Sequence, residues 1–145
     1  MRIGFGTDEH PLVDGRPLII GGVTIPFDKG LSGHSDADVL IHAIIDALLG
    51  AAGKGDIGGH FPDSDPRWKN ASGLKMLQRI TLILSENSVK IANIDCVILA
   101  LKPAMIPHIP EMISGICAIL NISSDRINIK AKSQNGLGDV GRGVS

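Results

Sequence analysis

The chain has 145 residues, of which 43% are apolar and 20% are charged, and its formal net charge is −1. This length suits one domain with a single core. The balanced charge excludes the basic stripe typical of nucleic-acid-binding proteins, and no apolar run is long enough to span a membrane, so we expect neither partner.

The N-terminal half predicts a strand, a hairpin and a helix. A short strand is expected at residues 2–6. Two apolar runs surround a glycine pair within residues 17–26, and such a pair forms the two-residue turn of a hairpin. A polar loop at 27–34 leads to a helix at 36–52, for which Ser35 is the expected cap and Gly53 the expected end.

The C-terminal half predicts two more helices and two strands. After a turn-rich loop at 53–66 we expect a helix at 71–87, a strand at 91–101, a helix at 107–120 and a strand at 126–132. A glycine-rich tail follows at 133–145. This order predicts an α/β (α+β) fold in one domain, 1–145, with one mixed sheet backed by helices on one face. Cys96 and Cys117 lie in apolar runs, which is typical of buried free thiols.

One carboxylate and two imidazoles are candidates for a metal site. Asp8 and His10 are two residues apart, so in extended chain their side chains lie on the same side. His42 lies in the predicted helix, on one stripe with Asp38 and Asp46. Three such ligands leave a fourth tetrahedral position open, as catalytic zinc requires, and Asp46 is the expected partner that orients His42. Spacing alone also allows Asp36 and Asp38 to favour the helix N-terminus electrostatically and His42 to be a core histidine.

Two segments have the composition of phosphate sites. His34 and Ser35 precede the predicted helix, whose N-terminal amides attract anions. The glycine-rich tail and the end of the strand before it carry Lys130, Lys132, Ser133 and Arg142. An ordinary glycine-rich terminus is the alternative for this second segment.

The loop at 53–66 contributes three acidic residues, Asp56, Asp63 and Asp65. Each is typical of turns. As a group they are also suited to holding the hydroxyl groups of a substrate.

Several motifs occur together and in order. They are D-x-H from Asp8, G-R-P-L-I-I-G-G-V from Gly15, H-S-D-A-D-V from His34, D-A-L-L-G-A-A from Asp46, D-I-G-x-x-F-P-D-S-D-P from Asp56, P-H-I-P from Pro107, K-A-x-S from Lys130 and L-G-x-x-G-R-G from Leu137. With these motifs nearly the whole chain resembles the 2-C-methyl-D-erythritol 2,4-cyclodiphosphate synthases.

This resemblance implies an enzyme of isoprenoid precursor synthesis by the non-mevalonate route. The family cyclises 4-diphosphocytidyl-2-C-methyl-D-erythritol 2-phosphate and releases CMP. It implies a homotrimer with active sites between subunits, a bound Zn²⁺, a second divalent ion (Mg²⁺ or Mn²⁺) bridging the diphosphate, and a bacterial cytoplasmic location.

The resemblance also implies the residues of the site. The zinc ligands are Asp8, His10 and His42, and the first two also contact the substrate. His34 and Ser133 are the catalytic donors, and Ser35 contacts phosphate beside His34. The methylerythritol part is held by Asp56, Ile57, Gly58, Phe61, Pro62, Asp63, Ser64 and Asp65. The cytidine and its phosphates are surrounded by Ala100, Pro103, Ala104, Met105, Ile106, Lys132, Ser133, Gln134 and Asn135, and Arg142 is expected near the phosphates.

Four positions depart from the family pattern. Asn135 stands where Glu is usual, Ala104 where Lys is usual, Lys132 where Thr is usual and Asp139 where Phe is usual. The first two motivate an alternative in which the chain is a non-catalytic trimer that binds zinc and nucleotide. A zinc phosphohydrolase is a second alternative, but no dedicated general base lies beside the proposed ligands. Asp139 argues against an isoprenyl diphosphate in the trimer channel, because a carboxylate is costly in an apolar cavity. The family also has a strand after G-R-G, which these 145 residues do not include.

Overall fold

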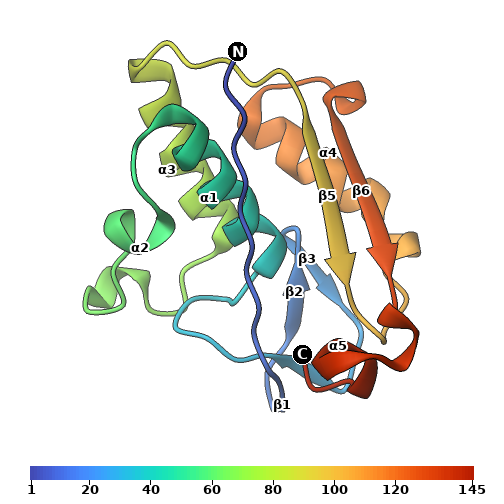
Figure 1. Ribbon diagram of the computed structural model, residues 1–145. Helices are drawn as coiled ribbons and strands as arrows, with labels where there is room; N and C mark the ends of the chain where they lie inside the picture. Colours follow the sequence, from blue (N-terminus) through green and yellow to red (C-terminus); the bar gives the residue numbers. More distant parts are fainter.

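Three pairs of short strands make up the sheet structure of the computed structural model, which describes all 145 residues (Figure 1). β1 (Leu12–Asp14) pairs with β4 (Lys29–Leu31), and β2 (Leu18–Ile20) pairs with β3 (Val23–Ile25), both antiparallel. β5 (Ile94–Leu99) and β6 (Ile127–Lys132) form a parallel pair. The mixed α/β class and the hairpin are confirmed, but the strands form three small sheets where one sheet was predicted.

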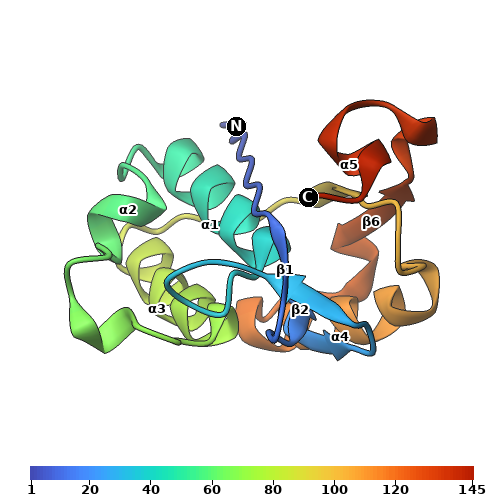
Figure 2. The same ribbon diagram turned by 90° about the horizontal axis from the view of Figure 1, so that it is seen from below.

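Three long helices form the body against which these strands pack. They are α1 (Val39–Ala52), α3 (Gly73–Glu86) and α4 (Ile109–Leu120). α1 packs on α3, α3 packs on α4, and α4 lies behind the β5–β6 pair (Figures 1 and 2). Shorter helical turns occupy the connections: α2 (Ile57–His60), η1 (Pro66–Trp68), η2 (Ile106–His108), η3 (Ser124–Arg126), η4 (Gln134–Gly136) and α5 (Gly138–Arg142).

The core is a single cluster of 23 buried apolar residues. α1 crosses its centre, and Ile41, Ile45 and Leu49 have no exposed surface. Burying a side chain of this kind stabilises the fold by about 1.5–3 kcal/mol. Along β6, Ile127 and Ile129 alternate with exposed residues and face α4, so one side of the parallel pair is left open.

A buried carboxylate joins the hairpin to the start of α1. Asp38 is the N-cap of α1 and accepts the Ile41 amide at 3.1 Å. Its two oxygens also accept the amides of Gly21 and Gly22, at 2.8 and 2.6 Å. Both glycines have positive φ, which the tight hairpin turn requires. Burial raises the pKa of Asp38 to about 6, although the three amides favour its ionised form.

The N-terminal segment, residues 1–11, runs extended along α1 without pairing with any strand (Figure 1). Gly4 and Gly6 bring it so close that a Cβ atom there would lie 1.7 Å from the Ala47 carbonyl oxygen and 2.1 Å from that of Ala43. An apolar groove separates the segment from β5. The strand predicted at 2–6 is therefore wrong, because no neighbouring chain satisfies its backbone groups.

Other differences lie in segments that were predicted to be loops. β4 lies within the loop expected at 27–34, α2 within that expected at 53–66, and α5 within the tail. α1 begins at Val39 with Asp38 as its cap, so the predicted cap at Ser35 is wrong. Cys96 and Cys117 are free thiols, as predicted, but they are half-buried where full burial was expected. None of the helices is both long enough and apolar enough to cross a membrane.

We expect Asp38→Ala to lower the free energy of unfolding by about 1–3 kcal/mol, because it removes a helix cap and leaves the buried Gly21 amide without an acceptor. The variant also avoids the desolvation cost of the buried Asp38 carboxylate, which offsets part of this loss. Urea denaturation at neutral pH measures the change. Asp28→Asn is the control, since Asp28 is exposed and makes no hydrogen bond. Equal stability of the two variants would contradict the role of Asp38.

Candidate active site

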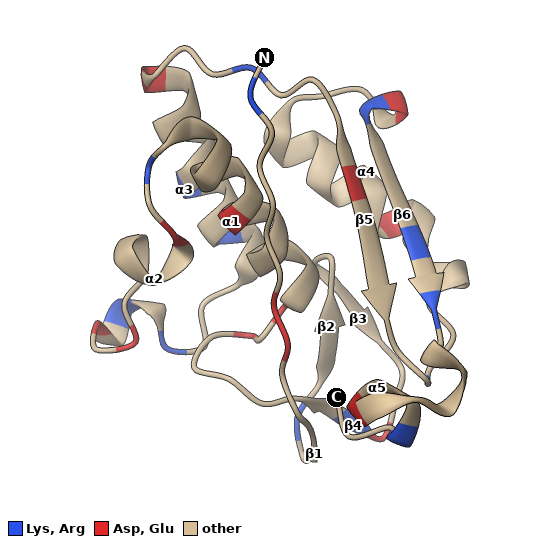
Figure 3. Ribbon diagram, viewed as in Figure 1, with Lys and Arg blue, Asp and Glu red and all other residues tan.

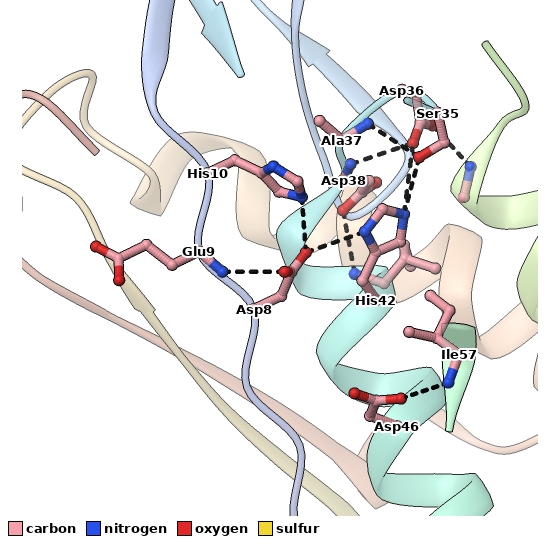
Figure 4. Close-up of polar contacts among 12 residues, drawn as sticks. Asp8, Glu9, His10, Ser35, Asp36, Ala37, Asp38, His42, Asp46 and Ile57 are labelled. Atoms are coloured by element: carbon pink, nitrogen blue, oxygen red, sulfur yellow. Dashed lines mark hydrogen bonds and ion pairs between the residues drawn. The ribbon is translucent and has the colours of Figure 1, made fainter. Parts of the chain in front are cut away.

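Three side chains from two distant parts of the chain converge on one point (Figure 4). Asp8 and His10 come from the extended N-terminal segment, and His42 comes from the first turn of α1. Asp8 Oδ2 lies 3.2 Å from His10 Nε2 and 3.0 Å from His42 Nδ1. The potential ligand atoms all lie within 4.8 Å of one another. A carboxylate and two imidazoles in this arrangement are the donor set of a divalent metal centre with an open position.

The opposite side of the His42 ring is held by Ser35. Ser35 Oγ lies 3.2 Å from His42 Nε2, and both residues are buried. A hydrogen bond to the second ring nitrogen fixes the ring and its tautomer, as metal-binding histidines require. The predicted partner, Asp46, is wrong: its Oδ1 accepts the Ile57 amide at 2.8 Å and so connects α1 to α2 (Figure 4).

The charges in this cluster support one another. Burial raises the pKa of Asp8, but the hydrogen bond from His42 and the positive potential of both imidazoles outweigh it and leave that pKa below 3.8. Burial lowers the pKa of His42, but Asp8, with Asp38 and Asp36, brings it above 6.5. In the metal-free chain, the lowered pKa of Asp8 adds stability that is fully present above pH 3.8 and is lost as the pH falls through that lowered pKa. The raised pKa of His42 adds stability that is fully present below pH 6.5 and is lost as the pH rises through that raised pKa.

The segment between β4 and α1 makes a different site from the one its sequence predicts. His34 and Ser35 were expected to bind an anion at a helix N-terminus, but α1 starts four residues beyond Ser35. The capping carboxylate of Asp38 already accepts the Ile41 amide, and Ser35 Oγ is engaged by His42 and by the Ala37 amide. His34 Nε2, in contrast, is buried and has no hydrogen-bond partner in the chain.

Asp36 was considered in the sequence only as an acidic residue that favours the helix N-terminus, and its contacts in this region were not predicted. Its Oδ2 accepts the Gly73 amide at 2.7 Å at the start of α3, and its Oδ1 accepts the Asp38 amide at 3.1 Å. Oδ1 also lies 4.0 Å from His42 Nε2. Asp36 therefore fixes α3 and adds negative potential at the imidazole. Its place in the H-S-D-A-D motif was the available signal.

The residues predicted to hold the methylerythritol part lie on α2 and the turn after it. Asp56 caps α2 by accepting the Gly59 amide at 2.9 Å. Phe61 is buried, with its ring 4.7 Å from that of Trp68, and Asp65 forms an ion pair with Arg67 at 2.6 Å. The other predicted residues follow the same chain path: Ile57, Gly58, Pro62, Asp63 and Ser64. Asp63 is the exposed carboxylate of this group that is not engaged within the chain.

The two segments predicted to surround the cytidine are brought together by the parallel pair. Leu99 is in register with Lys132, and the Ala100 amide donates to the Lys132 carbonyl at 3.0 Å. Residues 100–106 and 132–135 therefore both follow the carboxyl ends of the parallel strands β5 and β6. Ligands commonly bind at this end of parallel strands. The segments contain Ala100, Pro103, Ala104, Met105 and Ile106 on one side and Lys132, Ser133, Gln134 and Asn135 on the other.

Most of the basic residues predicted for phosphate already have acidic partners. Lys130 on β6 forms an ion pair with Asp95 on β5 at 2.5 Å (Figure 3). Arg142 forms an ion pair with Asp139 within α5. Lys132 makes no ion pair and is exposed next to Ser133. Lys102 in the facing segment is likewise exposed and unpaired, so both are available cations at the predicted cytidine site.

Comparisons with known proteins agree over the whole chain. A model of the YgbB family matches residues 1–145. A protein of Clostridium perfringens named 2-C-methyl-D-erythritol 2,4-cyclodiphosphate synthase is 57% identical over 143 residues, which is 99% of this chain and 92% of that protein. A protein of the same name from Clostridium botulinum is 58% identical over 142 residues, 98% of this chain and 92% of the relative.

Solved structures of proteins with this name have the same fold. One described as the CDP-bound form superposes with a TM-score of 0.88 at 37% identity, covering 94% of this chain and 91% of its own. A CDP complex of a Plasmodium falciparum protein has a TM-score of 0.85 at 31% identity, covering 99% and 88%.

We expect the affinity for a divalent metal to fall on acidification while the pH is still above 6.5, the ordinary pKa of histidine. A metal needs the neutral imidazole, and the raised pKa of His42 lets protons compete earlier. Zn²⁺ titrations against a competing chelator, in steps from pH 8 downwards, measure this. An affinity that stays constant down to pH 6.5 would contradict the Asp8–His42 coupling.

Ser35→Ala should weaken metal binding by about 10-fold or more, because it releases one side of the His42 ring. Asp46→Asn is the matched comparison and should change the affinity by less than about twofold, since the asparagine oxygen still accepts the Ile57 amide. Zn²⁺ affinity is the measurement for both. A larger loss in Asp46→Asn than in Ser35→Ala would restore Asp46 as the partner of His42.

Proposed function

The chain belongs to the YgbB family, and from this premise we infer that it converts 4-diphosphocytidyl-2-C-methyl-D-erythritol 2-phosphate to 2-C-methyl-D-erythritol 2,4-cyclodiphosphate with release of CMP. It is thus an intramolecular phosphoryl-transfer cyclase, a phosphorus–oxygen lyase of isoprenoid precursor synthesis. The convergence of Asp8, His10 and His42 is the observation that carries this conclusion, because three ligand atoms within 4.8 Å of one another can hold the divalent ion that the family's chemistry needs. The non-catalytic alternative gains no support from relatives that are named as synthases.

We propose Zn²⁺ as the metal of the Asp8–His10–His42 centre. Two imidazole nitrogens and one carboxylate oxygen suit zinc, and they leave a position for a substrate oxygen. When bound there, Zn²⁺ would supply Lewis acidity toward a phosphate oxygen. Asp8 and His10 then lie closest to the substrate, as the resemblance implies.

The reacting groups belong to the substrate, so the protein has to position them. The 2-phosphate is already an anion and needs no strong base. One of its oxygens forms a bond to the β-phosphorus, and the bond from that phosphorus to the CMP oxygen breaks with its electron pair. His34 and Ser133 are the proposed donors to the developing charge. The buried ring nitrogen of His34 lacks an acceptor within the chain, and a phosphate oxygen would supply one.

A second divalent ion, Mg²⁺ or Mn²⁺, is proposed to bridge the diphosphate. Asn135 is exposed in a turn, and its side chain makes no hydrogen bond within the chain. Its amide oxygen can coordinate Mg²⁺ but contributes no charge, so we expect weaker binding than a glutamate would give. Lys132, which has no acidic partner, supplies positive charge three residues earlier. Arg142 is proposed to approach the phosphates only after separating from Asp139.

We propose a homotrimer in which the active site is completed between subunits. No hydrogen bond within the chain joins the metal centre to the predicted cytidine site after β5 and β6. The open face of β5 exposes 47% of Val97 and 42% of Leu99, which is apolar surface suited to a second copy. With bacterial relatives of the same family, the bacterial cytoplasm is the proposed location.

The test of the function is CMP release from the 2-phosphate substrate, with ³¹P NMR to identify the cyclic product. We expect CMP and cyclic diphosphate in equal amounts, and more slowly when Mg²⁺ is withheld from the zinc-loaded protein. Inorganic phosphate from simple esters would indicate a phosphohydrolase instead. A folded, zinc-loaded trimer that releases no CMP would be a binding protein.

His42→Ala should lose bound zinc and reduce turnover by about 100-fold or more. His60→Ala is the matched control for zinc content. His60, the last residue of α2, donates to the Lys54 carbonyl and lies outside the metal cluster. Metal analysis and CMP release measure both variants. Zinc retained by His42→Ala together with normal CMP release would reject the assignment.

A further inference from the structure

A single arginine holds the backbone of the segment that contacts both imidazoles of the metal centre. Arg16 follows Gly15, whose positive φ makes the turn between β1 and β2. Its Nη1 donates to the Gly33 carbonyl at 3.0 Å and its Nη2 donates to the Ser35 carbonyl at 2.9 Å. The planar fork of a guanidinium can reach two acceptors at once, which an ammonium group cannot do in the same fixed geometry.

The held segment is otherwise anchored mainly at its two ends. Residues 32–38 belong to neither a helix nor a strand. At one end the Ser32 amide donates to the Pro11 carbonyl, and at the other the carboxylates of Asp36 and Asp38 accept amides from α3, the hairpin and α1. Between these ends, the other backbone contact of residues 33–35 is the Asn70 amide, which donates to the His34 carbonyl. The carbonyls of Gly33 and Ser35 accept their hydrogen bonds from Arg16. Without the guanidinium these two carbonyls would lose their protein donors.

The two residues that Arg16 holds are those that contact the two imidazoles of the metal centre. A Cβ atom on Gly33 would lie 3.0 Å from His10 Cε1, so the Gly33 backbone lies directly against the His10 ring. Ser35 Oγ lies 3.2 Å from His42 Nε2. A shift of this segment would therefore loosen both rings and move His34, which lies between Gly33 and Ser35.

One donor of the Arg16 guanidinium has no partner in the chain. It is the Nε group, which is buried. An unpaired buried donor is costly. The side chain therefore satisfies its two Nη donors while its Nε donor has no partner in the chain. This arrangement fits a side chain that is kept for the geometry of the segment it holds.

We propose that Arg16 is a positioning residue of the active site, whose guanidinium sets residues 33–35 and through them the orientation of His42, His10 and the catalytic donor His34. This inference rests on the proposed function for its kinetic consequences, but its effect on metal binding stands independently. Arg16 acts through Ser35 and Gly33 and does not touch the metal cluster itself. Loss of such outer contacts typically reduces metal affinity or activity by about 10–100-fold.

The test compares Arg16→Lys with Arg126→Lys. Arg126 donates to one backbone carbonyl, that of Ile91, at 3.1 Å, and it is an exposed residue at the end of η3, just before β6. Both changes keep the charge and remove the fork. The measurements are Co²⁺ affinity and the visible absorption of the Co²⁺-loaded protein, kcat and KM for CMP release, and the midpoint of urea unfolding. We expect Arg16→Lys to lose about 10–100-fold in Co²⁺ affinity and kcat, with an altered Co²⁺ spectrum and an unfolding midpoint close to that of Arg126→Lys.

A double variant separates positioning from a general effect on the fold. Because Arg16 acts partly through Ser35 and partly through Gly33, Arg16→Lys combined with Ser35→Ala should lose less Co²⁺ affinity than the product of the two single losses. Independent, multiplying losses would overturn the proposal. So would an Arg16→Lys variant whose Co²⁺ affinity and spectrum match the wild type, or one whose losses follow the unfolded fraction. Absence of CMP from the wild type would refute the proposed function, while the Co²⁺ measurements would still decide the role of Arg16.

Discussion

The buried Asp38 carboxylate is the contact on which the placement of the site depends. By accepting amides from the hairpin turn and from the first turn of α1, it fixes where the helix starts relative to β2 and β3. His42 follows one turn later on the same helix and is thereby directed at the N-terminal segment. Gly4 and Gly6 let that segment approach α1 closely enough for Asp8 and His10 to reach the imidazole. The metal centre therefore depends on two features outside it: the hydrogen bonds of Asp38 and the close approach of the N-terminal segment to α1 at Gly4 and Gly6.

Electrostatics and hydrogen bonds then hold the cluster in a form suited to a cation. Asp8 stays ionised because two imidazoles face it, and His42 is held on both ring nitrogens, by Asp8 and by Ser35. The same imidazole attracts protons more strongly than an ordinary histidine, so metal and proton compete for it. Around this centre Asp36 and Asp38 use their carboxylates on backbone amides, which keeps them from acting as further ligands.

The sequence predicted the elements whose signals are local. The apolar spacing located α3 and α4, and the glycine pair located the hairpin, and these elements are confirmed. D-x-H with His42 identified three residues whose side chains the fold does bring together. The sequence-based prediction failed where the structure of a segment depends on residues distant in the chain. The segment at 2–6 has the composition of a strand but no strand beside it, while β1 and β4 are short and form because they pair with each other. Asp46 has the right helical spacing to face His42, but the Ile57 amide of a later loop takes its carboxylate. The roles of Ser35 and Arg16 depend on loop geometry that no periodicity encodes.

X-ray absorption at the zinc edge of the loaded protein would show directly whether this fold assembles a zinc centre from Asp8, His10 and His42. We expect one zinc per chain, with two imidazole nitrogens and oxygen donors at about 2.0–2.2 Å. A sulfur shell at about 2.3 Å would instead assign the metal to Cys96 or Cys117. A spectrum with fewer than two imidazoles, or no zinc retained by the folded protein, would rule this centre out.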